Sequence, residues 1–196
     1  MLATNDTEIR AALHRKKLLH HRSEPNTVVI DELGLVHAKA RIDIAVINGC
    51  IHGYEIKSGV DKLDRLYGQI QLYKSCLEKL TVVCAGNHTA EIREVIPDWC
   101  GLMLARKGRR GGIDFLTLRR ATRNPEIDKS KLAHLLWRPE VIELLARLNA
   151  PKALLRRSRV EMYDFLAEAM TVSEITAYVR ACLVKRETWR RPQALA

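Results

Sequence analysis

The alternation of apolar and polar positions changes character near residue 124. Before that point, short β-branched runs between turn residues predict strands at 27–33, 41–47, 50–57, 80–85, 99–105 and 113–118. Helical spacing predicts a first helix from Thr4 to about His21, a second with an apolar stripe from Leu63 to Leu80, and a short third at 89–95. This order predicts an α/β fold in which helices flank a mixed sheet.

From Asn124 onward no strand pattern remains, and helices are predicted at 131–137, 139–148, 160–170 and 172–187. We therefore expect residues 1–123 to form the α/β core and residues 124–196 to form an all-helical extension. The basic last helix allows two interpretations, a helix-turn-helix-like DNA reader or a cap that covers the sheet or a dimer surface. We favour the cap.

Three charged residues interrupt the two apolar runs on either side of Asn48-Gly49, which is itself a strong hairpin signal. They are Asp43, Glu55 and Lys57, and a charge in a half-buried strand costs free energy unless it is paired or binds an ion. Glu55 and Lys57 are two positions apart and leave the same face of their strand. Two carboxylates and a lysine at one sheet edge suit a divalent-metal phosphodiesterase site.

The hairpin register decides whether such a site can exist. With a strict two-residue turn at Asn48-Gly49, Asp43 would lie opposite Tyr54 and the two carboxylates would point to opposite faces. A shift of one residue corrects this. We expect it at Gly49, in the left-handed conformation, or at a bulge at Gly53.

Asp43, followed on the next strand by Glu55-Ile56-Lys57, resembles the PD-(D/E)XK nuclease superfamily. Gln69 and Tyr73, four positions apart on the following helix, resemble the additional motif of its RecB-like branch. Glu8 on the first helix is similar to the helical Glu of archaeal Holliday-junction resolvases. The resemblance covers about residues 5 to 105 and implies a restriction-endonuclease-like core with the order α-β-β-β-α-β.

The resemblance also implies a chemistry, namely a Mg²⁺-dependent DNA nuclease in which Mn²⁺ can substitute. Asp43, Glu55 and the backbone carbonyl of Ile56 would hold the metal, and Lys57 would position or polarise the attacking water. Gln69 and Glu8 would complete the site. From the residues alone, Glu8 also fits a plain first-turn acid, and Gln69 also fits the edge of an apolar stripe. A bacterial or phage source and a homodimer are further expectations of the resemblance.

The net charge of +10 favours a polyanionic partner, and we expect DNA. Basic residues of the first helix, Arg10 among them, are interpreted as a solvated face that could hold phosphates beside a nuclease site. Candidate nucleic-acid contacts lie near the site and at the tip of a predicted basic hairpin: Arg41, Lys62, Arg65, Tyr73, Arg109 and Arg110. Arg41 could instead pair with Asp43.

Two other functions remain open at this stage. One is a non-catalytic nucleic-acid-binding or assembly protein, in which the site residues form a buried ion pair. The other is an RNA-directed toxin on the same scaffold. The five cysteines show no C-x-x-C spacing and predict reduced, buried thiols without a zinc site. There is no signal-peptide pattern and no apolar run near 18 residues, so we expect a cytoplasmic protein that does not contact a membrane.

Overall fold

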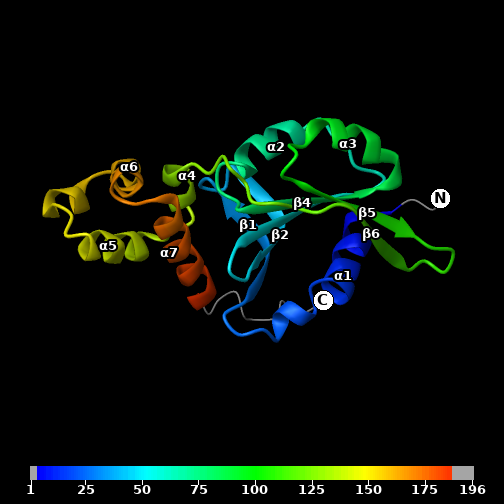
Figure 1. Cartoon of the computed structure of the whole chain (residues 1–196), viewed down its shortest axis with the longest axis horizontal. Helices are drawn as coiled ribbons and strands as arrows, with labels where there is room; N and C mark the ends of the chain where they lie inside the picture. Colours follow the sequence, from blue (N-terminus) through cyan, green and yellow to red (C-terminus); the bar gives the residue numbers. More distant parts are fainter. Residues whose placement is uncertain (1–3, 187–196) are drawn as a thin grey trace.

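A six-stranded mixed sheet lies at the centre of the computed structural model, which describes residues 4–186 (Figure 1). Its strands follow chain order: β1 (Val28–Leu35), β2 (Ala40–Ile47), β3 (Ile51–Lys57), β4 (Lys79–Ala85), β5 (Gly101–Lys107) and β6 (Ile113–Arg119). Neighbouring strands are antiparallel, except that β3, β4 and β5 run parallel to one another. The α/β class and all six strands are therefore as predicted.

Helices cover both faces of this sheet. On one face lie α2 (Leu66–Tyr73) and α3 (Thr89–Val95), and on the other lies α1 (Asp6–Lys16), followed by a 3₁₀ turn, η1 (His20–Arg22) (Figure 1). The buried side chains divide accordingly into two clusters. In the cluster under α1, Ile9 and Leu13 pack with sheet residues such as Ile44 and Val83. Strand β4 is buried on both faces, as its unbroken apolar run predicts.

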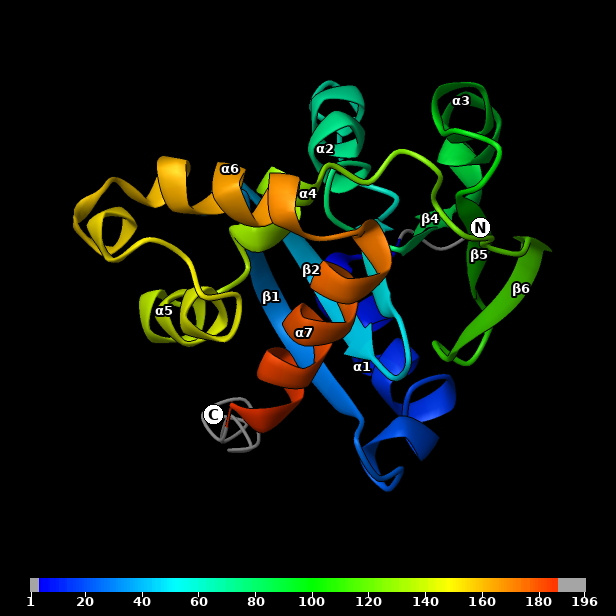
Figure 2. The same cartoon turned by 60° about the vertical axis from the view of Figure 1, so that its left-hand side comes forward.

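The C-terminal helices pack beside β1 and β2 (Figures 1 and 2). They are α4 (Lys129–Ala133), α5 (Arg138–Arg147), α6 (Arg159–Ala169) and α7 (Val172–Lys185). The predicted end of the last helix at Glu187 lies outside the described residues. Leu144, Tyr163 and Val179 belong to the same hydrophobic cluster as Val28 and Ile47 of the sheet. The extension therefore shares a core with the α/β part, as a cap would.

The helix after β3 is shorter than predicted. The apolar stripe predicts a helix through Leu80, but α2 ends at Tyr73, and Leu80 belongs to β4. Its start is also later, at Leu66. The Asp61 carboxylate before it accepts from the Ser58 backbone N–H at 2.6 Å and closes a turn. Tyr67, which has the helical spacing of this stripe, is 64% exposed. Pairing of β4 with β3 overrides the helical period here.

The β2–β3 hairpin has the register shift that a shared carboxylate site needs. Ile47 pairs with Ile51, so the loop has three residues, and Gly49 in it has φ of 72°. The ladder runs without interruption past Gly53 to Ile44 and Tyr54. Continued by one position, this register places Asp43 opposite Glu55. Of the two expected positions for the shift, Gly49 is correct and Gly53 is not.

The cysteines and the lengths of the helices bear on two further expectations. All five cysteines are free thiols, and four of them are buried. Between residues 4 and 186, no helix has both the length and the apolar character needed to cross a bilayer.

Candidate active site

Asp43 lies where β2 and β3 separate, beyond the last ladder pair. Its carboxylate bridges the opening, because Oδ2 accepts from the Ile56 backbone N–H at 2.6 Å. The N–H and C=O of one strand residue point to the same side, so the Ile56 carbonyl faces the same opening. The predicted third oxygen ligand is therefore on the Asp43 side of β3.

Glu55 and Lys57 form the buried part of the site. The Lys57 Nζ lies 2.7 Å from Glu55 Oε1, and the two side chains are 11% and 3% exposed. Lys57 also donates to Gln69 Oε1 at 3.0 Å. The Tyr73 hydroxyl is 2.7 Å from Glu55 Oε2, and Gln69 Nε2 donates to that hydroxyl at 3.2 Å. The structure thus brings Glu55, Lys57, Gln69 and Tyr73 into one hydrogen-bonded network between β3 and α2.

Tyr73 requires a correction. It was expected to contact nucleic acid, but it is fully buried, with its hydroxyl also 2.9 Å from the Arg41 carbonyl oxygen. Burial and the neighbouring Glu55 carboxylate raise the pKa of Tyr73, so it stays a neutral donor. Its place in the fold is that of a support for Glu55.

The Asp43 carboxyl is strongly perturbed. Burial, with a further contribution from the nearby negative charge of Glu55, raises the pKa of Asp43 to about 7. The Ile56 N–H and Arg10 act in the opposite direction. Two neighbouring carboxylates and an adjacent main-chain carbonyl are hard oxygen donors, which fits the requirements of Mg²⁺ or Mn²⁺.

Arg10, interpreted from sequence as part of a solvated face, is the main site residue that sequence reasoning missed. Its guanidinium donates to Asp43 Oδ1 at 2.8 Å and to the Asp43 carbonyl oxygen at 2.7 Å. Arg10, and not Arg41, pairs with Asp43. Arg41 is exposed, and its guanidinium approaches Glu32 at 3.7 Å. The local signal available for Arg10 is its spacing of four from Asp6, which says nothing about Asp43.

Glu8 has a local role in this structure. It completes the capping box of α1 with Asn5, and its carboxylate binds Lys107 Nζ at 2.6 Å. These contacts fit the interpretation of Glu8 as an ordinary acidic residue in the first turn of a helix. They also tie α1 to the end of β5, where the basic hairpin begins.

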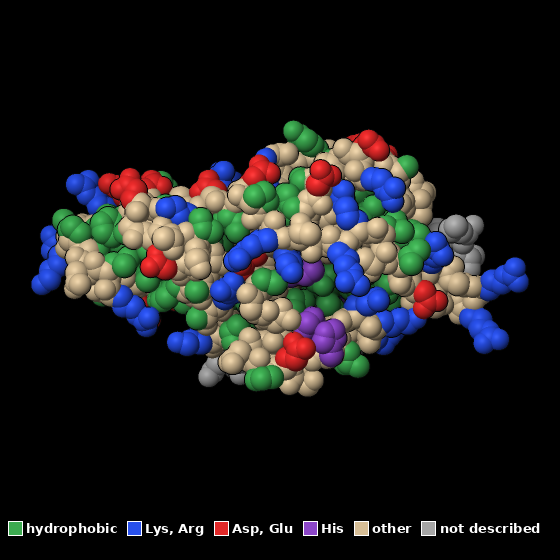
Figure 3. Space-filling view, viewed as in Figure 1, with side chains coloured by type: hydrophobic (Ala, Val, Ile, Leu, Met, Phe, Trp, Pro, Cys, Tyr) green, Lys and Arg blue, Asp and Glu red, His purple; other side chains and the backbone are tan. Residues whose placement is uncertain are grey.

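The remaining predicted nucleic-acid contacts are exposed. Lys62 and Arg65 precede α2, and Arg109 and Arg110 occupy the turn between β5 and β6, where Gly111 has φ of 80°. Figure 3 shows Lys and Arg side chains that project from this hairpin and others across the middle of the same face. The predicted basic edge hairpin is therefore present.

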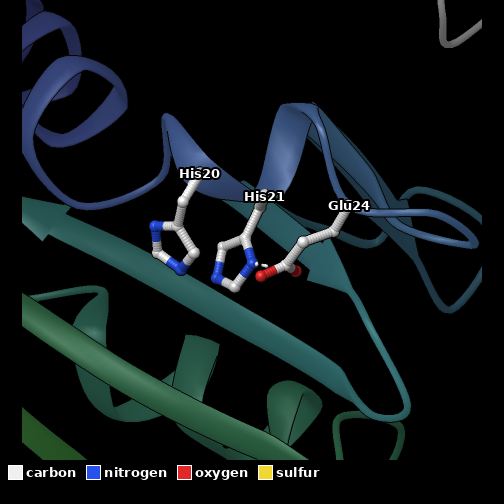
Figure 4. Close-up of side chains that lie close together, drawn as sticks. All are labelled: His20, His21 and Glu24. Carbon is white, nitrogen blue, oxygen red and sulfur yellow. Dashed lines mark hydrogen bonds and ion pairs between the residues drawn. The ribbon is translucent and has the colours of Figure 1, made fainter.

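A separate group, His20, His21 and Glu24, lies at the far end of β2 (Figure 4). One ligand atom from each lies within 4.8 Å of the others. His21 Nδ1 is 2.8 Å from Glu24 Oε2 and 3.3 Å from Asn48 Nδ2. Asn48 is five positions from Asp43, roughly 16 Å along the strand, so this group is separate from the carboxylate site.

The comparisons with known proteins give a family. Protein cII of Enterobacteria phage P4 is 36% identical over 78 residues, which cover 40% of this chain and 30% of that protein. Among solved structures, a protein of unknown function from Silicibacter pomeroyi matches 96% of this chain and 92% of its own, with 15% identity and a TM-score of 0.43. A family model described as bacteriophage P4 protein cII matches residues 3–192. That match spans almost the whole sequence, and the chain therefore belongs to the family of bacteriophage P4 protein cII.

Proposed function

We propose that this protein is a metal-dependent deoxyribonuclease with a restriction-endonuclease-like core. The observation that supports this most is the convergence of Asp43 and Glu55, from neighbouring strands, beside the buried Lys57 ammonium. Burying such a group of charges costs free energy, and charged groups of this kind often occur at functional sites, which supports a role in phosphodiester hydrolysis.

Each residue has a defined part in this proposal. Asp43, Glu55 and the Ile56 carbonyl would hold Mg²⁺, with Mn²⁺ as a substitute. A divalent cation there would offset the charge that develops on the phosphate and lower the pKa of the attacking water. Lys57 would donate from Nζ to that water or to a phosphate oxygen. Gln69 and Tyr73 would keep Lys57 and Glu55 in place through the contacts described above.

The overall reaction is hydrolysis. The water oxygen bonds to phosphorus, one P–O bond to a sugar breaks, and the departing alkoxide takes up a proton. The exposed Arg109 and Arg110 would hold the DNA backbone, in keeping with the net charge of +10.

The test is a set of labelled DNA and RNA substrates (duplex, single strand, flap and junction) with Mg²⁺ or Mn²⁺. The parent should cleave DNA. Lys57→Ala and Asp43→Ala should lose about 100-fold or more in rate, as expected for a group that positions the reacting water. Lys152→Ala, exposed on the helical extension, is the control and should match the parent. A Lys57→Ala variant as fast as the parent would refute the role of Lys57, and cleavage of RNA alone would favour a toxin.

A second function is favoured by one specific observation. Both carboxylates already have a cationic partner, Glu55 with Lys57 and Asp43 with Arg10. The group could thus be a structural ion-pair cluster in a nucleic-acid-binding protein that does not cleave. Calorimetric titration with Mn²⁺ separates the two. Heat of binding that Asp43→Ala abolishes supports the nuclease, whereas salt-sensitive DNA binding with no metal site supports the non-catalytic protein.

A further inference from the structure

The Arg10 guanidinium is surrounded by acidic groups from three elements. Besides its two bonds to Asp43, it lies 3.2 Å from Asp6 Oδ1 on its own helix and 2.9 Å from Glu32 Oε1 on β1. The side chain is 21% exposed, so much of its charge is shielded from water. Burial opposes that charge, but the carboxylates around it more than compensate and raise the pKa of Arg10.

This position is in conflict with metal binding at Asp43. The guanidinium contacts Asp43 Oδ1 at 2.8 Å, while Ile56 N–H occupies Oδ2. A divalent cation that binds the Asp43 carboxylate would therefore meet a positive charge on the same group, and like charges that close repel strongly in a partly buried site. The cation and Arg10 would therefore compete for the Asp43 carboxylate.

The surroundings define where Arg10 can go. Glu32 is 47% exposed and Asp6 is 42% exposed, so both lie toward solvent from Asp43, whose side chain is 19% exposed. An arginine that leaves Asp43 would stay paired with these two carboxylates, on the solvent side of Asp43. A planar guanidinium there matches the geometry of a phosphate group, which it binds with two parallel hydrogen bonds.

We propose that Arg10 is a metal-displaced positioning residue, which neutralises Asp43 in the metal-free protein and turns to a DNA phosphate when a divalent cation takes Asp43. The inference rests on the proposed nuclease function. It adds an order of events: metal binding at Asp43 and Glu55 releases Arg10, which then binds the DNA phosphate.

The experiment compares Arg10→Gln and Arg10→Lys with the parent. Arg156→Gln, exposed on the helical extension, is the matched control. Mn²⁺ affinity is measured by calorimetry without DNA, and kcat and KM are measured on a DNA substrate. For Arg10→Gln we expect Mn²⁺ to bind about 5-fold or more tightly, because its competitor is gone, and KM for DNA to rise by about 5-fold or more. Arg10→Lys keeps the positive charge but loses the paired N–H donors of the guanidinium. Its Mn²⁺ affinity and its KM for DNA should therefore lie between those of the parent and those of Arg10→Gln.

These opposite signs distinguish the proposal from a structural role, since a loosened site would lose both metal and substrate affinity. Thermal denaturation of each variant in chelator confirms that it is folded. If Arg10→Gln weakens Mn²⁺ binding, or behaves like Arg156→Gln while the parent shows an Asp43-dependent metal site and cleavage, the Arg10 role is overturned alone. If the parent binds no Mn²⁺ and cleaves nothing, the proposed function fails and the Arg10 role fails with it.

Discussion

The raised pKa of Asp43 makes the stability of the protein depend on pH. An ordinary aspartate has a pKa near 3.8, whereas burial and Glu55 raise the pKa of Asp43 to about 7. Between these two values the folded protein holds a proton that the unfolded chain releases. The free energy of unfolding therefore falls as pH rises through this window in the absence of divalent metal.

This sign leads to a measurable difference between the parent and Asp43→Asn. In chelator, raising the pH from 4.5 to 8 should destabilise the parent relative to Asp43→Asn by up to about 3 kcal/mol, because this range covers most of a shift of about three units. Urea denaturation at the two pH values measures it. Mn²⁺ should restore stability to the parent and leave Asp43→Asn unchanged. Equal pH profiles for the two proteins would contradict the raised pKa.

Among the elements, the β2–β3 hairpin sets the site. Its three-residue loop brings Asp43 into register with Glu55, and Gly53 leaves room for the side chain of Leu77, in the segment between α2 and β4. A Cβ at Gly53 would lie 2.6 Å from Leu77 Cδ1 and 3.0 Å from Ile42 Cγ1, in a region with little freedom to move. Gly53 is therefore required for packing and not for a bulge.

Gly53→Ala should accordingly destabilise the protein by about 1–3 kcal/mol, because the added methyl overpacks the sheet against the Leu77 side chain. Gly68 in α2 is the matched control, since nothing lies within 4 Å of its Cβ position. Gly68→Ala should stabilise by up to about 1 kcal/mol through helix propensity. Urea denaturation of both variants checks the pair. A Gly53→Ala protein as stable as Gly68→Ala would argue against the close packing of this face.

At the scale of the whole molecule, Glu78 joins the helical extension to the sheet. Its side chain is 2% exposed, and it accepts from the Ile51 backbone N–H at 2.9 Å. Arg180 of α7 donates to both of its oxygens, at 2.9 and 3.0 Å, and the exposed Arg123 lies 3.3 Å away. One carboxylate thus connects β3, α7 and the segment that leads into the extension.

Glu78→Ala should lower the free energy of unfolding by about 2–4 kcal/mol, because it leaves the buried Ile51 N–H and the partly buried Arg180 charge without their partner. Glu143, which is 57% exposed in an i,i+4 pair with Arg147, is the control. Its change to alanine should cost under about 0.5 kcal/mol. Chemical denaturation compares the two. Similar small losses would mean that the extension is held by apolar contacts alone.

Predictions from sequence succeeded where the signals are local. Alternation in β2 and β3 and the Asn48-Gly49 turn gave the hairpin, and helical spacing placed the starts of α6 and α7 to within one residue. They were less successful where a local helical pattern competes with strand pairing to a part of the chain that is distant in sequence. Leu80 continues a helical stripe, yet it gains more from a parallel strand between β3 and β5.

The sequence by itself determined the order and type of the elements and the three charges that enter the sheet. It also determined that a shared carboxylate site needs a register shift of one residue in the hairpin. Each of these depends on residues close together in the chain. Only the tertiary structure decided that Arg10 neutralises Asp43, 33 positions away, that Tyr73 supports Glu55, and that Glu78 holds α7. The physical reason is that such partners are chosen by how whole elements pack. A buried charge accepts whichever opposite charge that packing brings within reach.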